Sequence, residues 1–136
     1  MKNLSPSNTG QLTTGLFHNF SNRNCATTKI YVNRKRNNIS TSDIVMLEGL
    51  SNYTFIHLNN GEKILVSKTM KEFEETLLEN GFSRVHKSFL INLRYLSSIE
   101  TKGELFVILR TGQRVEISRR RKTSFQKEVL NYLKAN

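Results

Sequence analysis

Residues 81–92 read GFSRVHKSFLIN, a run in which apolar and polar side chains are interleaved. The apolar residues Phe82, Val85, Phe89 and Ile91 predict burial. Between them lies a polar cluster that consists of Arg84, His86, Lys87 and Ser88. Such a mixture is typical of a loop that is anchored by apolar side chains and presents polar groups outward. An irregular strand with a solvated edge explains the pattern equally well, so this stretch alone leaves both interpretations open.

The sequence before this stretch predicts short strands followed by one helix. Segments rich in β-branched and aromatic residues predict strands at 29–33, 43–48, 53–58 and 63–66. Asn59-Asn60-Gly61 predicts a hairpin turn, because Asn and Gly tolerate positive φ, and residues 34–38 read as a further turn. Residues 69–80 predict an amphipathic helix, with Thr69 and Glu72 placed as a capping box and Gly81 just past the helix end. The apolar face of that helix would be formed by Met70, Phe73, Leu77 and Leu78.

The sequence after this stretch predicts more strands and a final helix. Strands are expected at 98–100, 104–109 and 114–117, with a hairpin turn at 110–113. The final helix is expected to begin at Arg119 or Arg120 and to end at Leu133, with Phe125, Val129 and Leu133 on one face. The fold class is therefore mostly β, with antiparallel strands and two short helices. This pattern excludes a helix-turn-helix domain and an alternating parallel α/β fold.

The charge of the chain indicates a polyanionic partner. The chain has 136 residues and a formal net charge of +10. Residues 1–40 carry six basic and no acidic side chains, 41–80 carry three basic and seven acidic, and 81–136 carry twelve basic and four acidic. Nucleic acid is the leading candidate and an anionic membrane surface the second, while a merely soluble basic protein is the simplest alternative. The length supports one domain, expected at 29–136, preceded by a flexible polar tail at 1–28.

Catalysis, metal binding and membrane insertion are not indicated. Asp43 is the one aspartate, and the three histidines lack metal-ligand spacing. Ser88 lies near His86, but no orienting carboxylate has a recognised spacing to them. No nucleotide-binding glycine motif, apolar stretch of about 20 residues or signal peptide is present, and the single Cys25 excludes an internal disulfide framework. We therefore expect a cytoplasmic protein that is not an enzyme and takes no cofactor and no metal.

Two further segments are candidates for contact with an anion. Ser118 is followed by four consecutive cations, Arg119 to Lys122, where the final helix should begin. A helix N-terminus disfavours cations but favours a phosphate, which could meet both the side chains and the exposed N–H groups. A solvated charge run is the alternative. Asn52 and Tyr53 follow a predicted strand, and Asn suits bidentate contact with adenine, although a lone Asn in a loop is more often a turn residue.

Together these pieces resemble the LytTR-type DNA-binding domain of bacterial transcription regulators. The resemblance spans about residues 29–134 and rests on four blocks in family order, namely 43–49 with 52–54, 64–70, 81–92 and 115–121. It implies a fold of small stacked antiparallel sheets with few helices. It also implies sequence-specific binding to duplex DNA by loops that enter successive major grooves. Family sites are commonly direct repeats in promoters, so two copies would bind in tandem, as a homodimer on DNA and a monomer when free, with no membrane partner.

The resemblance also assigns roles to individual residues. By position, the residues expected to contact bases are Asn52, Tyr53, Lys87 and Arg120. Those expected to contact phosphates are Arg84, His86, Ser88, Arg119, Arg121 and Lys122. A family domain usually follows a phosphoacceptor receiver domain, for which this chain has no room. We therefore expect either a stand-alone regulator or a fragment.

Two competing functions remain at this point. A β module that binds RNA or single strands without sequence preference would need several exposed aromatic residues on one sheet. The phenylalanines instead lie in apolar patterns that predict a core, at Phe55, Phe73, Phe82, Phe89 and Phe106. A domain that uses its basic patches to bind a membrane surface or another protein would need an exposed apolar helix face, which the final helix could supply only by leaving the core.

Overall fold

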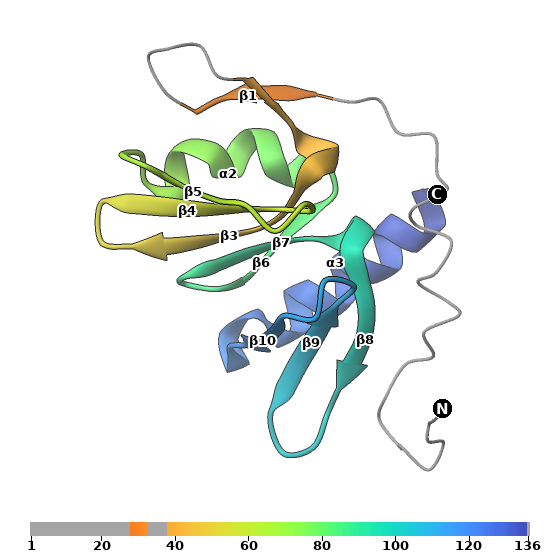
Figure 1. Cartoon of the computed structure of the whole chain (residues 1–136). Helices are drawn as coiled ribbons and strands as arrows, with labels where there is room; N and C mark the ends of the chain where they lie inside the picture. Colours follow the sequence, from red (N-terminus) through yellow and green to blue (C-terminus); the bar gives the residue numbers. More distant parts are fainter. Residues whose placement is uncertain (1–27, 33–37, 136) are drawn as a thin grey trace.

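The computed structural model describes residues 28–32 and 38–135 (Figure 1). The expected tail at 1–28, except Thr28, and the expected turn at 34–38, except Asn38, lie outside the described residues. The first described strands are β1 (Lys29–Tyr31), β2 (Asn38–Ser40), β3 (Ile44–Leu50), β4 (Tyr53–Leu58) and β5 (Lys63–Val66). After helix α2 (Met70–Leu78) come β6 (Phe82–His86), β7 (Phe89–Asn92), β8 (Leu96–Glu100), β9 (Leu105–Leu109), β10 (Arg114–Ile117) and helix α3 (Lys122–Ala135). Short 3-10 helices are η2 (Thr41–Asp43), η3 (Leu93–Tyr95) and η4 (Arg119–Arg121).

The strands form three antiparallel sheets, so the expected mostly β class with two helices is confirmed. A five-stranded sheet has the order β5-β4-β3-β7-β6, a three-stranded sheet the order β10-β9-β8, and β1 pairs with β2. In Figure 1 the five-stranded sheet lies in the middle, with α2 and the small β1-β2 sheet on one side and the three-stranded sheet and α3 on the other.

Both sides of the five-stranded sheet contribute to the core, because each is covered by another layer. Strand β3 shows this directly, since the four consecutive residues from Ile44 to Leu47 are all buried. Ile44 and Leu47 pack with Phe73 and Leu77 of α2, whereas Val45 and Met46 belong to a second cluster. That second cluster also contains residues of the three-stranded sheet and Phe125 and Val129 of α3.

Local signals in the sequence set several element boundaries. β4 and β5 coincide with their predicted ranges. Helix α2 begins with the predicted capping box, in which the backbone N–H of Thr69 donates to the Glu72 carboxylate at 2.7 Å. Gly81 follows the helix with φ +81°, a value that favours glycine.

The structure decides between the two interpretations left open for residues 81–92. The strand interpretation is confirmed, because β6 and β7 form a hairpin whose sheet buries Leu90 and Ile91 on opposite faces. Two other predictions differ from the structure. The first three arginines of the basic run wind into η4, so α3 begins only at Lys122, and Ser118 holds the N-cap position of η4 without a side-chain hydrogen bond. Residues 38–40, read as the end of a turn and the residues after it, form β2.

The prediction that all five phenylalanines lie in the core is wrong for two of them. Phe73 and Phe82 are buried, and the half-buried Phe89 packs against the second cluster, but Phe55 and Phe106 are half-buried and belong to neither cluster. The Lys63 ammonium lies 4.5 Å from the Phe55 ring centre, and the Arg114 guanidinium lies 3.7 Å from that of Phe106. These two rings are therefore shielded by a cation rather than by a packed layer.

Candidate nucleic-acid interface

The three segments expected to contact DNA lie on the same side of the molecule. They are the turn between β3 and β4, the turn between β6 and β7, and η4 with the start of α3. In Figure 1 they follow one another down the left edge. Two backbone hydrogen bonds connect them: Gly49 N–H donates to the Ser88 carbonyl, and Ser118 N–H donates to the Val85 carbonyl, each at 2.8 Å. These two bonds thus link the three segments to one another.

The β3–β4 turn exposes two of the expected residues. It consists of Ser51 and Asn52 alone, because Leu50 pairs directly with Tyr53. Ser51 has φ 56°, in the left-handed region that a tight hairpin requires. Asn52 is exposed and Tyr53 is 50% exposed, so both side chains can reach a ligand outside the protein.

The β6–β7 turn is equally short and is stabilised by a hydrogen bond between its own residues. Lys87 at its tip is exposed, and His86 and Ser88 beside it are half-buried. The Ser88 N–H donates to His86 Nδ1 at 3.1 Å, so the neutral imidazole carries its proton on Nε2. The His86 ring also lies against Phe89, with ring centres 5.5 Å apart. The turn therefore has one defined shape, with the Lys87 side chain as its free end.

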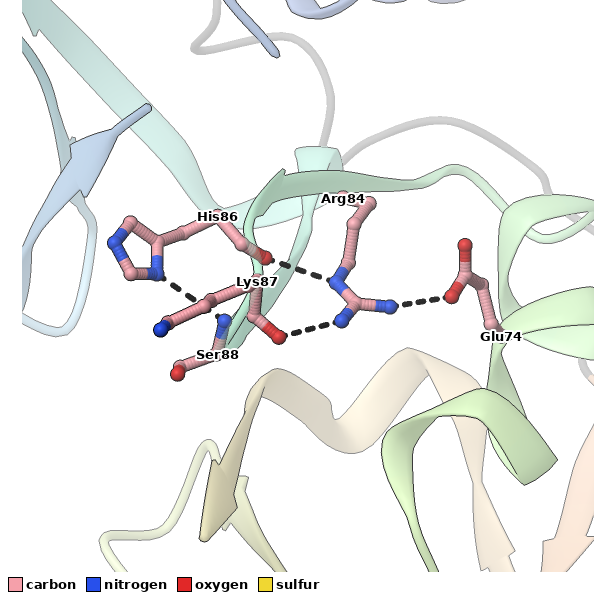
Figure 2. Close-up of polar contacts among 5 residues, drawn as sticks. All are labelled: Glu74, Arg84, His86, Lys87 and Ser88. Carbon is pink, nitrogen blue, oxygen red and sulfur yellow. Dashed lines mark hydrogen bonds and ion pairs between the residues drawn. The ribbon is translucent and has the colours of Figure 1, made fainter. Parts of the chain in front are cut away.

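Arg84, expected to contact phosphate, lies behind this turn and has three partners within the protein. Its guanidinium forms an ion pair with Glu74 of α2. Its Nε donates to the His86 carbonyl at 2.9 Å, and one terminal nitrogen donates to the Lys87 carbonyl (Figure 2). The Arg84 side chain is only 16% exposed. The sequence alone does not distinguish Glu74 as part of the site, because its spacing places it among the other glutamates of an amphipathic helix.

The basic run presents its cations to solvent. Arg119, Arg120 and Lys122 are exposed and Arg121 is half-buried. The Arg121 N–H donates to the Ser118 carbonyl at 3.0 Å and closes η4. Within the described part of the chain, no hydrogen bond or ion pair holds the side chains of these four residues.

Three carboxylates of the described residues contact basic side chains. Glu48 contacts His57 at 3.1 Å, and Glu100 pairs with Arg114 at 3.2 Å. The Glu74–Arg84 pair is a third contact of this kind. The cations of the run at 119–122 and Lys87 have no such partner in the described residues, so they remain available to an external anion.

The described residues offer neither a metal-binding group nor a membrane-spanning helix. Across residues 28–32 and 38–135, no three His, Cys, Asp or Glu side chains are grouped so that they could hold a metal ion. No described helix combines the length and apolar character needed to cross a membrane.

Comparisons with known proteins show the family and the fold. A family model described as the LytTr DNA-binding domain matches residues 34–129. The fold is similar to the LytTr DNA-binding domain of a Bacillus cereus protein described as a methyl-accepting/DNA response regulator. The TM-score is 0.63 at 20% identity, and the match covers 78% of this chain and 98% of that one. A comparison with curated proteins found no match. Because the family model covers well over half of the residues, the chain belongs to the LytTR family of DNA-binding domains, which is not a family of enzymes.

Proposed function

We propose that this protein is a sequence-specific transcription regulator that reads duplex DNA with three turns in successive major grooves. The observation that carries the proposal is the alignment of the β3–β4 turn, the β6–β7 turn and η4 along one side of the molecule. Each segment is narrow, and the major groove, about 12 Å wide, admits an element of this size. Cations without internal partners lie at two of the three segments, where phosphates and base edges would meet them.

The proposed base contacts come from the most exposed side chains. Lys87 and Arg120 can donate to guanine O6 and N7, and Asn52 can pair bidentately with adenine. Tyr53 offers its half-exposed ring and hydroxyl beside Asn52. These four side chains lie at or next to the three segments, as reading of successive positions requires.

The proposed phosphate contacts flank these positions. They are His86, through its Nε2–H, together with Ser88, Arg119, Arg121 and Lys122. Arg84 is left out of this set, because its guanidinium already bonds to Glu74 and to two carbonyl groups.

On DNA, we propose that two copies bind a pair of direct repeats and that the free protein is a monomer in the cytoplasm. One copy presents a single row of reading turns, so one row matches one half-site and a second half-site needs a second copy. Head-to-tail placement of two copies gives direct rather than inverted repeats.

The experiment that tests the proposal is selection from a random duplex library with the full chain. The expected result is one enriched motif that occurs twice in the same orientation. The selected duplex is then offered in competition with its own single strands and with RNA of the same sequence. Equal competition by single strands or RNA, or failure to enrich any motif, would show a general nucleic-acid-binding module instead.

Half-buried aromatic residues speak against that alternative. Phe55 lies in the five-stranded sheet and Phe106 in the three-stranded sheet, and each is covered by the cation of a neighbouring strand. A platform for stacking bases would need such rings open and side by side.

A further inference from the structure

We propose that Glu74 of helix α2 is a positioning residue for DNA recognition, acting through Arg84 on the turn that presents Lys87. The inference rests on the proposed function, because it concerns how one of the reading turns is held. Glu74 itself lies behind that turn and is separated from Lys87 by the Arg84 guanidinium (Figure 2).

Each of the three guanidinium nitrogens of Arg84 has one partner. Nη1 pairs with the Glu74 carboxylate, Nε donates to the His86 carbonyl at 2.9 Å, and Nη2 donates to the Lys87 carbonyl. Because a guanidinium is planar and rigid, fixing one edge on the carboxylate aims the other nitrogens at the two carbonyl groups. The position of the carboxylate therefore determines where both carbonyl groups of the turn point.

This arrangement leaves the Lys87 side chain directed away from the protein. With its own carbonyl turned inward to Arg84, Lys87 extends to the opposite side from the guanidinium in Figure 2. The strand register shifts between Arg84 and His86, which marks a bulge that lets both carbonyl groups face the same cation. Without the guanidinium, two backbone carbonyl groups would lose their partners and the turn could rotate.

The Glu74–Arg84 pair is partly withdrawn from solvent, which strengthens its hold. The two side chains are 26% and 16% exposed, so screening by water is weaker than at an ordinary surface pair. The other acidic residues of the helix differ in this respect. Glu75 and Glu79 are exposed, and Glu72 forms the capping box at the start of α2.

Helix α2 also packs against β3 close to the neighbouring reading turn. A Cβ added at Gly49 of β3 would lie 2.9 Å from the Sδ of Met70, the first residue of α2. Gly49 in turn donates to the Ser88 carbonyl. The helix therefore lies against β3 through Met70 and contacts the β6–β7 turn through the pair of Glu74 with Arg84.

The test compares Glu74→Gln with Glu75→Gln in the full chain. Both substitutions remove one carboxylate from the same helix, so both raise the net charge equally and affect general attraction to DNA alike. The readout is the ratio of affinities for the selected duplex and for a scrambled duplex. We expect Glu74→Gln to lower this ratio by about tenfold, the size of one mismatched base pair, and Glu75→Gln to leave it unchanged.

A second variant, Arg84→Lys, separates positioning from charge and from folding. Lysine keeps the positive charge beside Glu74 but cannot donate to the carboxylate and both carbonyl groups at once. We expect the same loss of ratio as in Glu74→Gln, and no further loss when Glu74→Gln is combined with Arg84→Lys, because both act on one turn. Thermal unfolding of each variant shows that the compared proteins are folded.

The outcomes separate the two proposals. If the unmodified chain enriches no duplex, the proposed function itself fails. If it enriches a motif but Glu74→Gln keeps the full ratio, or if both glutamine variants lower it equally, the positioning role of Glu74 is overturned while the function stands. If Glu74→Gln cannot be obtained folded, an unchanged ratio in Arg84→Lys overturns the role in the same way.

Discussion

At the scale of single residues, Arg120 and Lys122 allow base reading to be distinguished from phosphate contact. Both side chains are exposed, two positions apart, in η4 and at the start of α3. Arg120→Ala should relax the preference at one base step by about 1–3 kcal/mol, because a bidentate contact with guanine is lost. Lys122→Ala should weaken all sequences alike and reduce the slope of log affinity against log salt by about 1. Titration of matched and mismatched duplexes at several salt concentrations measures both, and a changed consensus in Lys122→Ala would contradict the assignment.

Gly81 is the residue at which backbone conformation and packing both demand glycine. Its φ is +81°, and an added Cβ would lie 2.7 Å from Cε1 of Tyr132 in α3. Gly81→Ala should therefore lower the free energy of unfolding by about 2–4 kcal/mol, through left-handed strain and overpacking together. Gly103→Ala is the control, because Gly103 has φ +74° but open space around it, and should cost only about 1–2 kcal/mol. Equal losses in urea unfolding would show that Tyr132 yields without cost.

For Arg84, the sequence predicted the neighbouring residues but not the direction of the side chain. The sequence identified the residues 84 to 88 as one cluster, and the structure does bring them together at a single turn. It could not show that Arg84 faces inward. That orientation depends on Glu74, ten residues away in a helix whose packing against the sheet is a tertiary property.

At the scale of elements, the docking of α3 determines where the basic run is presented. Phe125 is fully buried and Val129 is 3% exposed in the cluster shared with the three-stranded sheet. Ser83 of β6 also donates to the Glu128 carboxylate and fastens the helix to the five-stranded sheet. The terminal helix is thus part of the core, as its apolar spacing predicted, and its start is held beside the β6–β7 hairpin.

Truncation of Phe125 should consequently lower the stability of the protein. Phe125→Ala removes a large buried side chain and should lower the free energy of unfolding by about 3–5 kcal/mol. Leu130→Ala in the same helix, where the side chain is 57% exposed, should change it by less than about 0.5 kcal/mol. Chemical unfolding measures both. A small loss for Phe125→Ala would mean that α3 does not depend on this side chain for docking.

Elements with a strong local signal were predictable, whereas those defined by long-range pairing were not. The turn at 59–61 and the capping box at Thr69 fixed β4, β5 and α2 closely. The short strand β2 gave no such signal, because it exists only through pairing with β1. The half-buried positions of Phe55 and Phe106 likewise depend on which parts of a sheet another layer covers.

At the scale of the whole molecule, Tyr95 connects the layers. Its hydroxyl donates to the Ser42 carbonyl and accepts from Asn59 Nδ2 at 3.1 Å, and its carbonyl accepts from Arg110 N–H at 2.7 Å. These partners lie in η2, in the β4–β5 turn and directly after β9. One residue thus connects the five-stranded sheet to the three-stranded sheet, so we expect its substitution to lower the stability of the whole fold.

This junction should make stability sensitive to alkaline pH. Burial raises the pKa of the Tyr95 phenol above its usual value and outweighs the hydrogen bond from Asn59, which lowers it. Because the folded pKa is the higher one, the contribution to stability is fully present below the unfolded value of about 10, and it is lost as the pH rises through the folded pKa. Tyr95→Phe should cost about 1–2 kcal/mol near neutral pH, since the hydroxyl bonds are lost, and this difference from the unmodified protein should shrink above about pH 10.

Urea unfolding of both proteins from neutral to alkaline pH measures that difference directly. Other groups that titrate in this range, such as lysines, are common to both proteins and cancel in the comparison. Tyr53→Phe removes a phenol from the exposed β3–β4 hairpin and serves as the control for loss of a hydroxyl as such. If the difference for Tyr95→Phe stayed constant across the whole range, the phenol would titrate alike in the folded and unfolded states, and the junction would not be the pH-sensitive point of the fold.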